Sequence, residues 1–280
     1  MRRLLICSEK DIASKNIAAA LVAAGGWKDR GRDGGAAYQI RGDDVLMTIQ
    51  ELHVWADNLD KKAAAAGFPA DVAVFLSEHE AASGMPALTV HPIGNYHDAR
   101  VGGRSQTLVK PAPALMSNGL RLIKKYCDLP GFNVCFEATH HGPYLELPTF
   151  FIEIGSDSRN WDRKDAAAIQ ARVVAEDMTG NDYPTVIGVG GGHYTPRFTE
   201  LALSRQVNFA HFLPNYQMEG RDDEDLVRCL KLASAAAETK LVFLHRKSMN
   251  GAQAARIHQL AESAGLEILK TEDFAPLTEN

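Results

Sequence analysis

The sequence predicts an α/β fold in which a mostly parallel mixed sheet carries helices on both faces. Short apolar runs such as residues 71–77 alternate along the chain with segments of helical periodicity. These apolar runs are nearly continuous, which is typical of strands that are buried on both sides of a sheet. The chain has 280 residues and 45% of them are hydrophobic, so it is long enough to bury a large core.

Each element is predicted from its local pattern. Residues 37–50 are expected to form a hairpin, because two strand-like runs flank Gly42-Asp43. Residues 162–180 are expected to form a helix with Asp162 as its N-cap and Gly180 near its end. The other predicted strands cover residues 3–7, 71–77, 87–92, 132–140, 149–156, 184–193, 207–214, 240–246 and 266–270, and the other predicted helices cover 11–26, 56–67, 114–127, 197–205, 223–237 and 251–265.

Residues 1–280 are predicted to form one domain, because the sequence has no low-complexity tract, no internal repeat and no clear linker. The composition shifts near residues 100–112, so a division into two lobes at that point is the alternative. This region lies within a loop predicted over residues 94–113, and loops of that length often carry function.

Charge and cysteine content exclude several classes of protein. The formal net charge is −5 and the pI is about 6.1, which argues against a DNA-binding protein or one that coats nucleic acid nonspecifically. Cys7, Cys127, Cys135 and Cys229 show no CxxC spacing and are expected to be reduced thiols. The first apolar run is too short for a signal peptide, and no run is long enough to span a bilayer. We therefore expect a soluble cytoplasmic protein with no membrane partner.

Histidines recur at the ends of the predicted strands. Sites in open α/β sheets gather at the carboxyl edge, so we expect at least two of these histidines to share a site there. A lone strand histidine is most often a core or surface residue, but this recurrence favours a site. On a regular strand His140 and His141 would point to opposite faces, so that one faces the site while the other braces it or packs away. The set comprises His79, His91, His140, His141 and His193, and Glu153 lies in the strand predicted over residues 149–156.

No single motif identifies the chemistry. Residues 79–83, HEAAS, begin like the zincin pattern HExxH, but the fifth residue is Ser83, so the second metal ligand is missing. Zinc held by dispersed histidines and a carboxylate such as Glu153 stays open, because imidazole and carboxylate both suit that metal. The chain has no GxSxG nucleophile elbow, and none of its cysteines lies in a recognisable activating setting.

Three consecutive glycines, Gly190, Gly191 and Gly192, precede His193. They match neither the Walker pattern nor GxGxxG, because no Gly-Lys-Ser/Thr follows and His193 occupies the position of the third glycine. Their backbone amides are predicted to form an oxyanion or phosphate nest. The alternative is a tight turn that requires positive φ angles.

Positive charge is concentrated between Asp98 and Asp128, where the sequence has no acidic residue. On an acidic protein, such a stretch is typical of a surface that contacts phosphates. A solvated helix face followed by a loop accounts for the charges equally well. The cations are Arg100, Arg104, Lys110, Arg121, Lys124 and Lys125.

Four ordered motifs together resemble the archaeal- and plant-type D-aminoacyl-tRNA deacylases, the family that includes the archaeal D-tyrosyl-tRNA deacylases. They are LLICSEKDIASKNI at residues 4–17, SEHEAASGMPALTVHPIGN at 77–95, EATHHGPYLELPTFFIEIGS at 137–156 and VIGVGGGHYTPRFTELAL at 186–203. The resemblance spans nearly the whole chain. Residues 25–39 contribute nothing to it.

The resemblance implies hydrolysis of the ester between a D-amino acid and the 3′-terminal ribose of tRNA, which frees the tRNA for correct charging. It also implies dependence on Zn²⁺, a monomer, and an α/β fold like those of peptidyl-tRNA hydrolases and nucleoside phosphorylases. D-aminoacyl-tRNA is then the expected partner. Ester hydrolysis requires an activated water and a stabilised oxyanion.

Residue roles follow from the resemblance as expectations. His141, His193 and His140 are the expected catalytic residues, and Gly190–Gly192 would stabilise the oxyanion. The metal candidates are His79, His91 and Glu153, which would share the ion with His141 and His193. The residues expected to bind tRNA are Arg100, Arg104, Lys110, Lys124 and Lys125.

Three alternatives stay open at this point. A peptidyl-tRNA hydrolase or another small-ester hydrolase would use the same pocket, and a nucleoside phosphorylase would use the glycines to bind phosphate. A noncatalytic RNA-binding module is opposed by the net acidity, the strand-end histidines and the absence of an RRM or KH signature.

Overall fold

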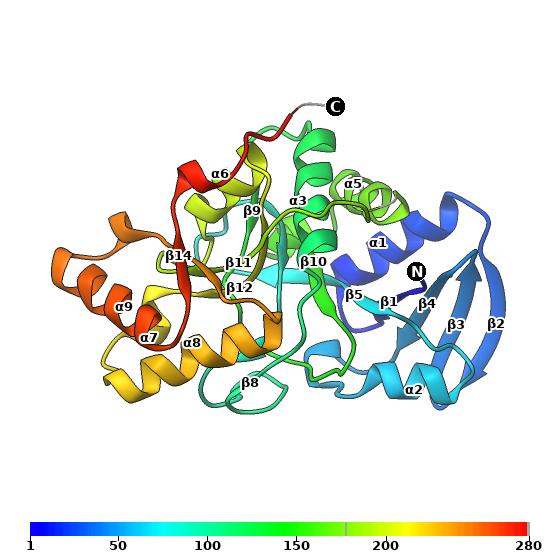
Figure 1. Cartoon of the computed structure of the whole chain (residues 1–280). Helices are drawn as coiled ribbons and strands as arrows, with labels where there is room; N and C mark the ends of the chain where they lie inside the picture. The colour runs from blue at the N-terminus through cyan, green and yellow to red at the C-terminus, as the bar shows by residue number, and fades with distance from the viewer. Residues whose placement is uncertain (177, 279–280) are drawn as a thin grey trace.

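The computed structural model describes residues 1–176 and 178–278, and its strands form two main sheets (Figure 1). The larger sheet has eight strands in the order β2-β3-β4-β1-β5-β10-β6-β9, and the smaller has four in the order β12-β11-β13-β14. A short ribbon of β7 (Gly94–Asn95) and β8 (Thr107–Leu108) lies within the predicted long loop. The predicted α/β fold with a mostly parallel mixed sheet is confirmed.

The larger sheet has a parallel centre and antiparallel flanks. Its parallel centre consists of β4 (Asp44–Ile49), β1 (Arg3–Ser8), β5 (Val72–Glu80) and β10 (Thr149–Ser156). On one side, β6 (Ala87–His91) runs antiparallel to β10 and carries the parallel strand β9 (Asn133–Phe136). On the other side, the predicted hairpin forms as β3 (Ala36–Arg41) and β4, and β2 (Lys28–Asp33) extends it.

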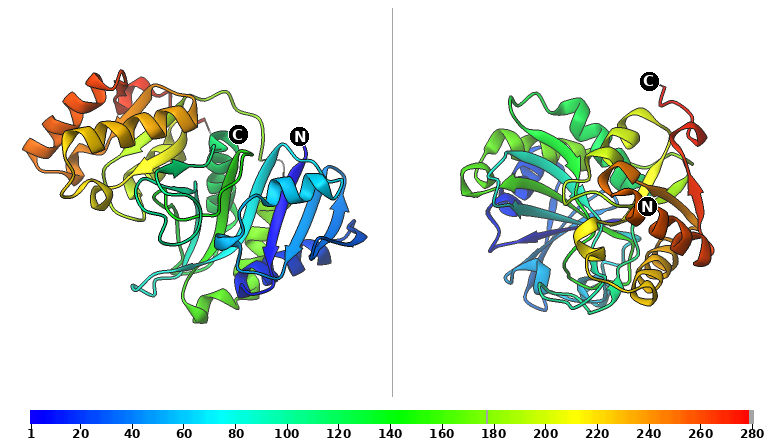
Figure 2. Two further views of the ribbon diagram at one scale, coloured as in Figure 1. Left: turned by 90° about the horizontal axis from the view of Figure 1, so that it is seen from below. Right: turned by 90° about the vertical axis from the view of Figure 1, so that its left-hand side faces the viewer.

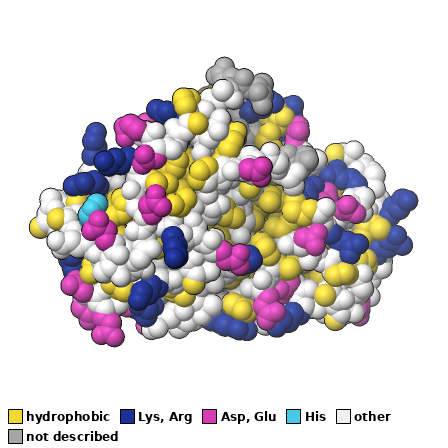
Figure 3. Space-filling view, in the orientation of Figure 1, with side chains coloured by type: hydrophobic (Ala, Val, Ile, Leu, Met, Phe, Trp, Pro, Cys, Tyr) yellow, Lys and Arg dark blue, Asp and Glu magenta, His cyan; other side chains and the backbone are white. Residues whose placement is uncertain are grey.

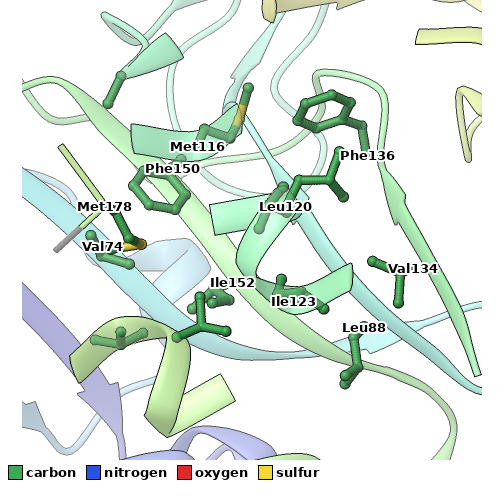
Figure 4. Packing of buried hydrophobic residues seen from close by; sticks show 14 of the residues in the cluster. Val74, Leu88, Met116, Leu120, Ile123, Val134, Phe136, Phe150, Ile152 and Met178 are labelled. Atoms are coloured by element: carbon green, nitrogen blue, oxygen red, sulfur yellow. The ribbon is translucent and has the colours of Figure 1, made fainter. Parts of the chain in front are cut away.

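Helices cover both faces of this sheet because alternate side chains of each buried strand point to opposite faces. On one face, α1 (Ile12–Ala23), α3 (Pro113–Tyr126) and α5 (Lys164–Ala175) pack on Val74, Phe150 and Ile152. Figure 4 shows Met116, Leu120 and Ile123 of α3 against Phe150 and Ile152. On the other face, α2 (Leu59–Ala65) and the 3₁₀ helix η1 (His53–Trp55) pack near Phe75 and Phe151.

The smaller sheet is wholly parallel; some of its buried residues form a separate core, and others, such as Phe209 and Phe212, join the core of the larger sheet. It consists of β12 (Asn208–Leu213), β11 (Thr185–Val189), β13 (Leu241–Leu244) and β14 (Glu267–Leu269). Its helices are α6 (Pro196–Ser204), α8 (Asp223–Ala237) and α9 (Gly251–Ser263). Figure 2 shows this C-terminal part beside the larger sheet, with the residues of β2 and β3 at the far side. Short helices lie at α4 (Ser158–Trp161), α7 (Asn215–Met218), η2 (Arg246–Ser248) and η3 (Thr271–Asp273).

Two boundary predictions are wrong. The helix predicted over residues 162–180 is α5, which ends at Ala175, so Gly180 is not its terminus. Asp162 is not its N-cap either, because α4 ends just before Asp162, whose carboxylate accepts a hydrogen bond from the Lys164 ammonium at 2.9 Å. The single-domain prediction, with a division near 100–112 as its alternative, stays a prediction. The change of sheet takes place between β10 and β11. None of the helices in the described ranges has both the length and the apolar character needed to cross a membrane.

Candidate active site

The predicted histidines meet over one face of the larger sheet. Along β10, Gly155 pairs with His79 of β5, and Phe151 pairs with His91 of β6. Every second side chain of a strand shares a face, so His79, His91 and Glu153 point to the same side. Because β6 is antiparallel to β10, its carboxyl end lies beside Phe151, near the amino end of β10, whereas His79 lies near the carboxyl end of β5. The site therefore extends across one face of the sheet, and its predicted place at the carboxyl edge of the parallel strands holds for His79 and is wrong for His91.

The segment after β9 brings His140 and His141 together. β9 ends at Phe136, four residues earlier than residue 140, so neither histidine lies on a regular strand. His141 has a left-handed backbone conformation with φ of 42°, which L-residues rarely adopt. The His140 and His141 rings lie 4.3 and 5.0 Å from the His91 ring, measured between centroids. The expectation that the two side chains point to opposite faces is therefore wrong.

The C-terminal sheet holds this segment in place. The Thr139 hydroxyl accepts a hydrogen bond from the Phe212 N–H at 2.8 Å and lies 3.1 Å from Nδ1 of His211. His211 is fully buried in β12, and its Nε2 lies 3.0 Å from a backbone carbonyl. Burial lowers the pKa of His211 to about 3, which keeps its imidazole neutral. His211 therefore braces the segment and does not face the site.

Three histidines form what we call the carbonyl-held trio: His91, His140 and His141. Nδ1 of each lies near a backbone carbonyl oxygen, at 3.1, 2.7 and 2.6 Å respectively. When Nδ1–H is donated to a carbonyl, Nε2 carries the free lone pair. One ligand atom of each histidine lies within 4.8 Å of those of the other two. The buried Nε2 of His91 has no hydrogen-bond partner among the described residues. This arrangement fits a metal that prefers nitrogen ligands.

The environment of the trio discourages positive charge on two of its members. Burial and the neighbouring imidazole of His141 hold the pKa of His140 well below its usual range. Burial and His91 lower the pKa of His141 to about 3. His91 differs, because Oε1 of Glu153 lies 3.4 Å from its Nε2. Burial opposes a charge on His91, but the carboxylate outweighs burial and raises the pKa.

A second set, which we call the acid-paired set, consists of Glu137, His79 and His193. Oε2 of the fully buried Glu137 lies 3.0 Å from Nδ1 of His79 and 2.9 Å from Nε2 of His193. Burial favours a neutral Glu137, but hydrogen bonds from the two histidines hold its pKa well below its usual range. Burial also opposes a charge on His79, but Glu137 and Glu153 raise the pKa of His79 to about 10. This set therefore stabilises a carboxylate next to an imidazolium.

Tyr194 completes the surroundings of His79. Its hydroxyl lies 2.9 Å from Nε2 of His79 and 3.1 Å from the Ser156 hydroxyl. Because Nδ1 of His79 already lies against Glu137, both ring nitrogens of this histidine are engaged within the protein. His79 is thus a poorer candidate for metal ligation than the trio, although its role as a ligand was predicted and stays untested.

A hollow of about 370 Å³ opens beside His140 and His141. Two guanidinium groups lie in its wall, so it suits a substrate that carries negative charge near the bond to be cleaved. Its lining residues are Asn95, His97, Asp98, Arg100, Val101, His140, His141, Gln217 and Arg221.

The glycine turn differs from its predicted role. The Gly190 N–H donates to the Leu213 carbonyl at 2.9 Å, and the Gly191 N–H donates to the Ser248 hydroxyl at 2.8 Å. Two of the three amides of the predicted nest, those of Gly190 and Gly191, are thus engaged within the protein, so the nest prediction is wrong for them. Gly190 and Gly191 have φ angles of 100° and 84°, which fits the alternative of a tight turn. Gly192, the third member, stays a prediction.

The predicted tRNA-binding cations are spread over several environments. Arg100 lines the 370 Å³ hollow. The Arg104 guanidinium stacks 3.6 Å from the centre of the Tyr144 ring, and Lys110 forms a 2.7 Å ion pair with Glu238.

The remaining cations lie on α3. Arg121 is not available for phosphate, because its guanidinium donates hydrogen bonds to the Val207 and Ala202 carbonyls at 2.7 and 2.9 Å and joins the two sheets. Lys124 and Lys125 lie in the last turn of α3, roughly 16 Å along the helix axis from its first residue. The five predicted cations therefore come from two segments, the loop over residues 94–113 and the last turn of α3.

Two contributors to the site were not predicted from the sequence. Glu137 is the hub of the acid-paired set, and Tyr194 contacts His79. Both were adjacent to predicted residues, Glu137 three positions before His140 and Tyr194 directly after His193. A carboxylate at the end of an apolar strand, followed at once by a pair of histidines, was the signal that marked Glu137.

Comparison with known proteins identifies the family. The family model described as D-aminoacyl-tRNA deacylase matches residues 66–269. The chain belongs to the D-aminoacyl-tRNA deacylase family. A D-aminoacyl-tRNA deacylase of Methanosarcina acetivorans is 35% identical over 96% of this chain and 92% of the relative. One from Thermococcus onnurineus is 32% identical over 96% of this chain and 99% of the relative.

A solved structure of a conserved protein of unknown function has the same fold as this deacylase-family chain. It superposes with a TM-score of 0.88 at 31% sequence identity and covers 98% of each chain. The match includes both sheets, so the arrangement that brings His193 of the smaller sheet to the histidines of the larger one belongs to the shared fold.

Proposed function

We propose that this protein hydrolyses the ester bond between a D-amino acid and the 3′-terminal ribose of tRNA. The observation that carries the proposal is the direct contact between the carbonyl-held trio and the acid-paired set, beside a hollow whose lining includes His140, His141 and two arginines. Membership of the deacylase family supplies the substrate class. Ester hydrolysis needs both an electrophilic or water-activating centre and a proton carrier, and the two sets supply these separately.

We propose zinc as the metal and His91, His140 and His141 as the residues that hold it. Nδ1 of each lies beside a carbonyl oxygen, and one ring nitrogen of each lies within 4.8 Å of those of the other two, which suits a metal that prefers imidazole ligands. Bound zinc supplies Lewis-acid chemistry, namely polarisation of an ester carbonyl and of water. His79, Glu153 and His193, which the sequence predicted as candidate ligands, are not among the residues proposed to hold the metal. His79 and His193 contact Glu137. Glu153 lies between the two sets.

His193 is the member of the acid-paired set best placed to exchange a proton with the substrate. About 32% of its side chain is exposed, whereas His79 and Glu137 are buried. We assign it protonation of the leaving ribose oxygen through its Nδ1, because its Nε2 lies 2.9 Å from the buried Oε2 of Glu137. His79, held by Glu137 and Tyr194, keeps the Glu137 carboxylate oriented and charged.

Arg100 and Arg221 are proposed to contact the phosphate next to the 3′-terminal nucleoside, because both line the hollow beside His140 and His141. Arg104, Lys110, Lys124 and Lys125 are retained as proposals for contacts farther along the tRNA. A monomeric state and a cytoplasmic location are likewise proposals. Light scattering of the purified protein tests the monomer, and fractionation of the source cells tests the location.

The direct test is hydrolysis of D-Tyr-tRNA and of L-Tyr-tRNA by the purified protein, with and without chelation and zinc re-addition. Cleavage of the D form alone, lost on chelation and restored by zinc, is the expected result. D-specific cleavage that is indifferent to chelation would contradict the metal proposal and keep the substrate. Cleavage of N-acetylaminoacyl-tRNA with none of D-Tyr-tRNA would replace the proposal by peptidyl-tRNA hydrolysis.

A further inference from the structure

The carboxyl edge of the smaller sheet has the geometry of a ligand site. Strand β11 lies inside this sheet. The next strand along the chain, β12, pairs with one edge of β11, and β13 pairs with its other edge and is followed outward by β14. All four strands are parallel, so the strand order reverses between β11 and β13. In open parallel sheets, ligands bind outside the carboxyl ends of the strands at such a reversal. Gly190 follows β11 at this point, and His245 follows β13.

A hollow of about 670 Å³ lies along this edge, larger than the 370 Å³ hollow beside the histidines. Its floor is apolar and contains Phe243, Leu244, Ile268 and Leu269. Figure 3 shows Lys and Arg side chains gathered beside hydrophobic surface on the upper left of the molecule, over the C-terminal sheet and its helices. We call this hollow the C-terminal hollow.

The walls of the C-terminal hollow carry excess positive charge on a protein whose net charge is −5. Arg246, Lys247 and Lys270 are exposed, and none of them forms an ion pair within the described ranges of the chain. Arg197 is fixed by Glu200 at 2.9 Å and by the Thr271 hydroxyl at 2.7 Å, a geometry that holds its guanidinium at the wall. The acids in the lining are Glu200 and Glu272.

The C-terminal hollow and the active site share one segment of chain. A Cβ atom added at Gly191 would lie 3.2 Å from Nδ1 of His245, which lines the hollow. Two residues farther on, His193 contacts Glu137 of the acid-paired set. Arg197 follows four residues after His193, a span of at most about 14 Å. Consecutive nucleotides of a single RNA strand could therefore reach both places.

We propose that the C-terminal hollow binds a nucleotide unit of the tRNA acceptor arm upstream of the 3′-terminal adenosine. Its phosphate would lie against Arg246, Lys247 and Lys270, with the ribose and base over the apolar floor. This inference rests on the proposed function, because the 3′ end must enter the site at His193. It places a tRNA contact on the smaller sheet, outside residues 100–125, where the sequence predicted it.

The test compares two double charge reversals. Arg246→Glu with Lys247→Glu alters the C-terminal hollow, and Arg30→Glu with Arg32→Glu is the matched control on the exposed strand β2, at the far edge of the larger sheet. The Kd of each protein for uncharged tRNA is measured by fluorescence anisotropy across a range of salt concentrations. The first double variant should raise the Kd for tRNA about tenfold or more. It should also lower the slope of log Kd against log salt concentration by about one to two, which corresponds to the loss of one to two phosphate contacts. The control should change Kd less than about twofold.

A milder pair, Arg246→Gln with Lys247→Gln, keeps the test valid if the reversed protein unfolds, and thermal unfolding identifies that case. It should weaken tRNA binding less than the reversal does and in the same direction. Equal tRNA affinity of the hollow variant and the control would overturn the proposal. A second result would also overturn it: the Arg246/Lys247 variant loses binding of AMP but keeps its affinity for tRNA. The C-terminal hollow would then bind a free nucleotide and not a unit of tRNA.

The outcome also separates this inference from the proposed function. If the wild type binds tRNA through the C-terminal hollow but cleaves no D-aminoacyl-tRNA, the hydrolytic proposal fails and the tRNA contact stands. If the wild type cleaves D-Tyr-tRNA and the hollow variant shows the same KM as the control, the contact fails and hydrolysis stands.

Discussion

The carbonyl-held trio consists of histidines alone, whereas the acid-paired set places two histidines around a buried carboxylate, and the electrostatics of the two sets differ. In the trio, each Nδ1 lies against a backbone carbonyl, and the pKa values of His140 and His141 are lowered. In the acid-paired set, Glu137 contacts His79 and His193, and the pKa of His79 is raised to about 10. A carbonyl fixes a neutral tautomer, and a buried carboxylate stabilises an imidazolium.

The two sets are in direct contact. Nε2 of His140 lies 3.7 Å from Oε2 of Glu137, and the His140 and His193 rings lie 4.8 Å apart between centroids. Glu153, which belongs to neither set, lies within 3.6 Å of both His79 and His91. His140 of the trio and Glu137 of the acid-paired set are thus direct neighbours. We infer that this closeness allows ligation and proton transfer to act on one ester, and the predictions below separate the two tasks.

The largest effect is expected for His141→Ala, which removes one lone pair from the trio. Deacylation of D-Tyr-tRNA should fall below detection, because two imidazoles do not complete a three-ligand site. Initial rates with and without added zinc are the measurement. Near wild-type activity in a folded His141→Ala protein would contradict the assignment of the trio.

His193→Ala should lower kcat by about 10²- to 10⁴-fold, the usual contribution of a positioned general acid or base. It should leave the metal in place, because His193 is not one of the trio, although its ring lies 4.8 Å from that of His140 between centroids. Single-turnover rates over a range of pH check this. A variant that loses its metal together with its activity would show that His193 is a ligand.

Tyr194→Phe removes one hydroxyl that contacts both His79 and Ser156. A buried partner left without its hydrogen bond costs about 1–3 kcal/mol, so kcat should fall about tenfold if His79 orients Glu137. KM should be unchanged, since the Tyr194 hydroxyl is engaged by His79 and Ser156 and not directed to the substrate in this account. A rise in KM at constant kcat would instead place Tyr194 against the substrate.

The smallest effect concerns the support of the trio by His211. Its pKa is about 3 in the folded chain against an ordinary 6.5, so between these values the unfolded chain binds a proton that the folded chain lacks. Stability should therefore fall as pH drops from 7 to 5, with about 2 kcal/mol of the fall due to this residue. His211→Gln lacks the titrating group and should show a shallower fall in urea unfolding. An identical pH dependence in both proteins would contradict a neutral buried His211.

The sequence predicted the elements better than the site. Nearly continuous apolar runs, such as the one in β5, identify buried strands because both of their faces are covered. Strand β2 escaped prediction because its residues, Lys28–Asp33, are all exposed and mostly charged or glycine. The direction of β6 also escaped, since the local pattern of a strand does not encode whether its neighbour is parallel or antiparallel.

For the site, the histidines were predicted but their grouping was not. Nothing in the spacing relates Glu137 to His79 and His193, which lie 58 and 56 residues away along the chain. The common direction of His140 and His141 depends on a left-handed conformation at His141 that the sequence does not reveal. The side-chain partner of the Gly191 amide, Ser248, likewise comes from a distant loop.

Metal content tests the division between the two sets most directly. The wild type, His141→Ala and Glu137→Gln are purified after zinc loading, and zinc per chain is measured by elemental analysis. We predict that the wild type and Glu137→Gln retain equal zinc, whereas His141→Ala retains almost none. Loss of zinc in Glu137→Gln together with full retention in His141→Ala would contradict the account and move the metal to the acid-paired set.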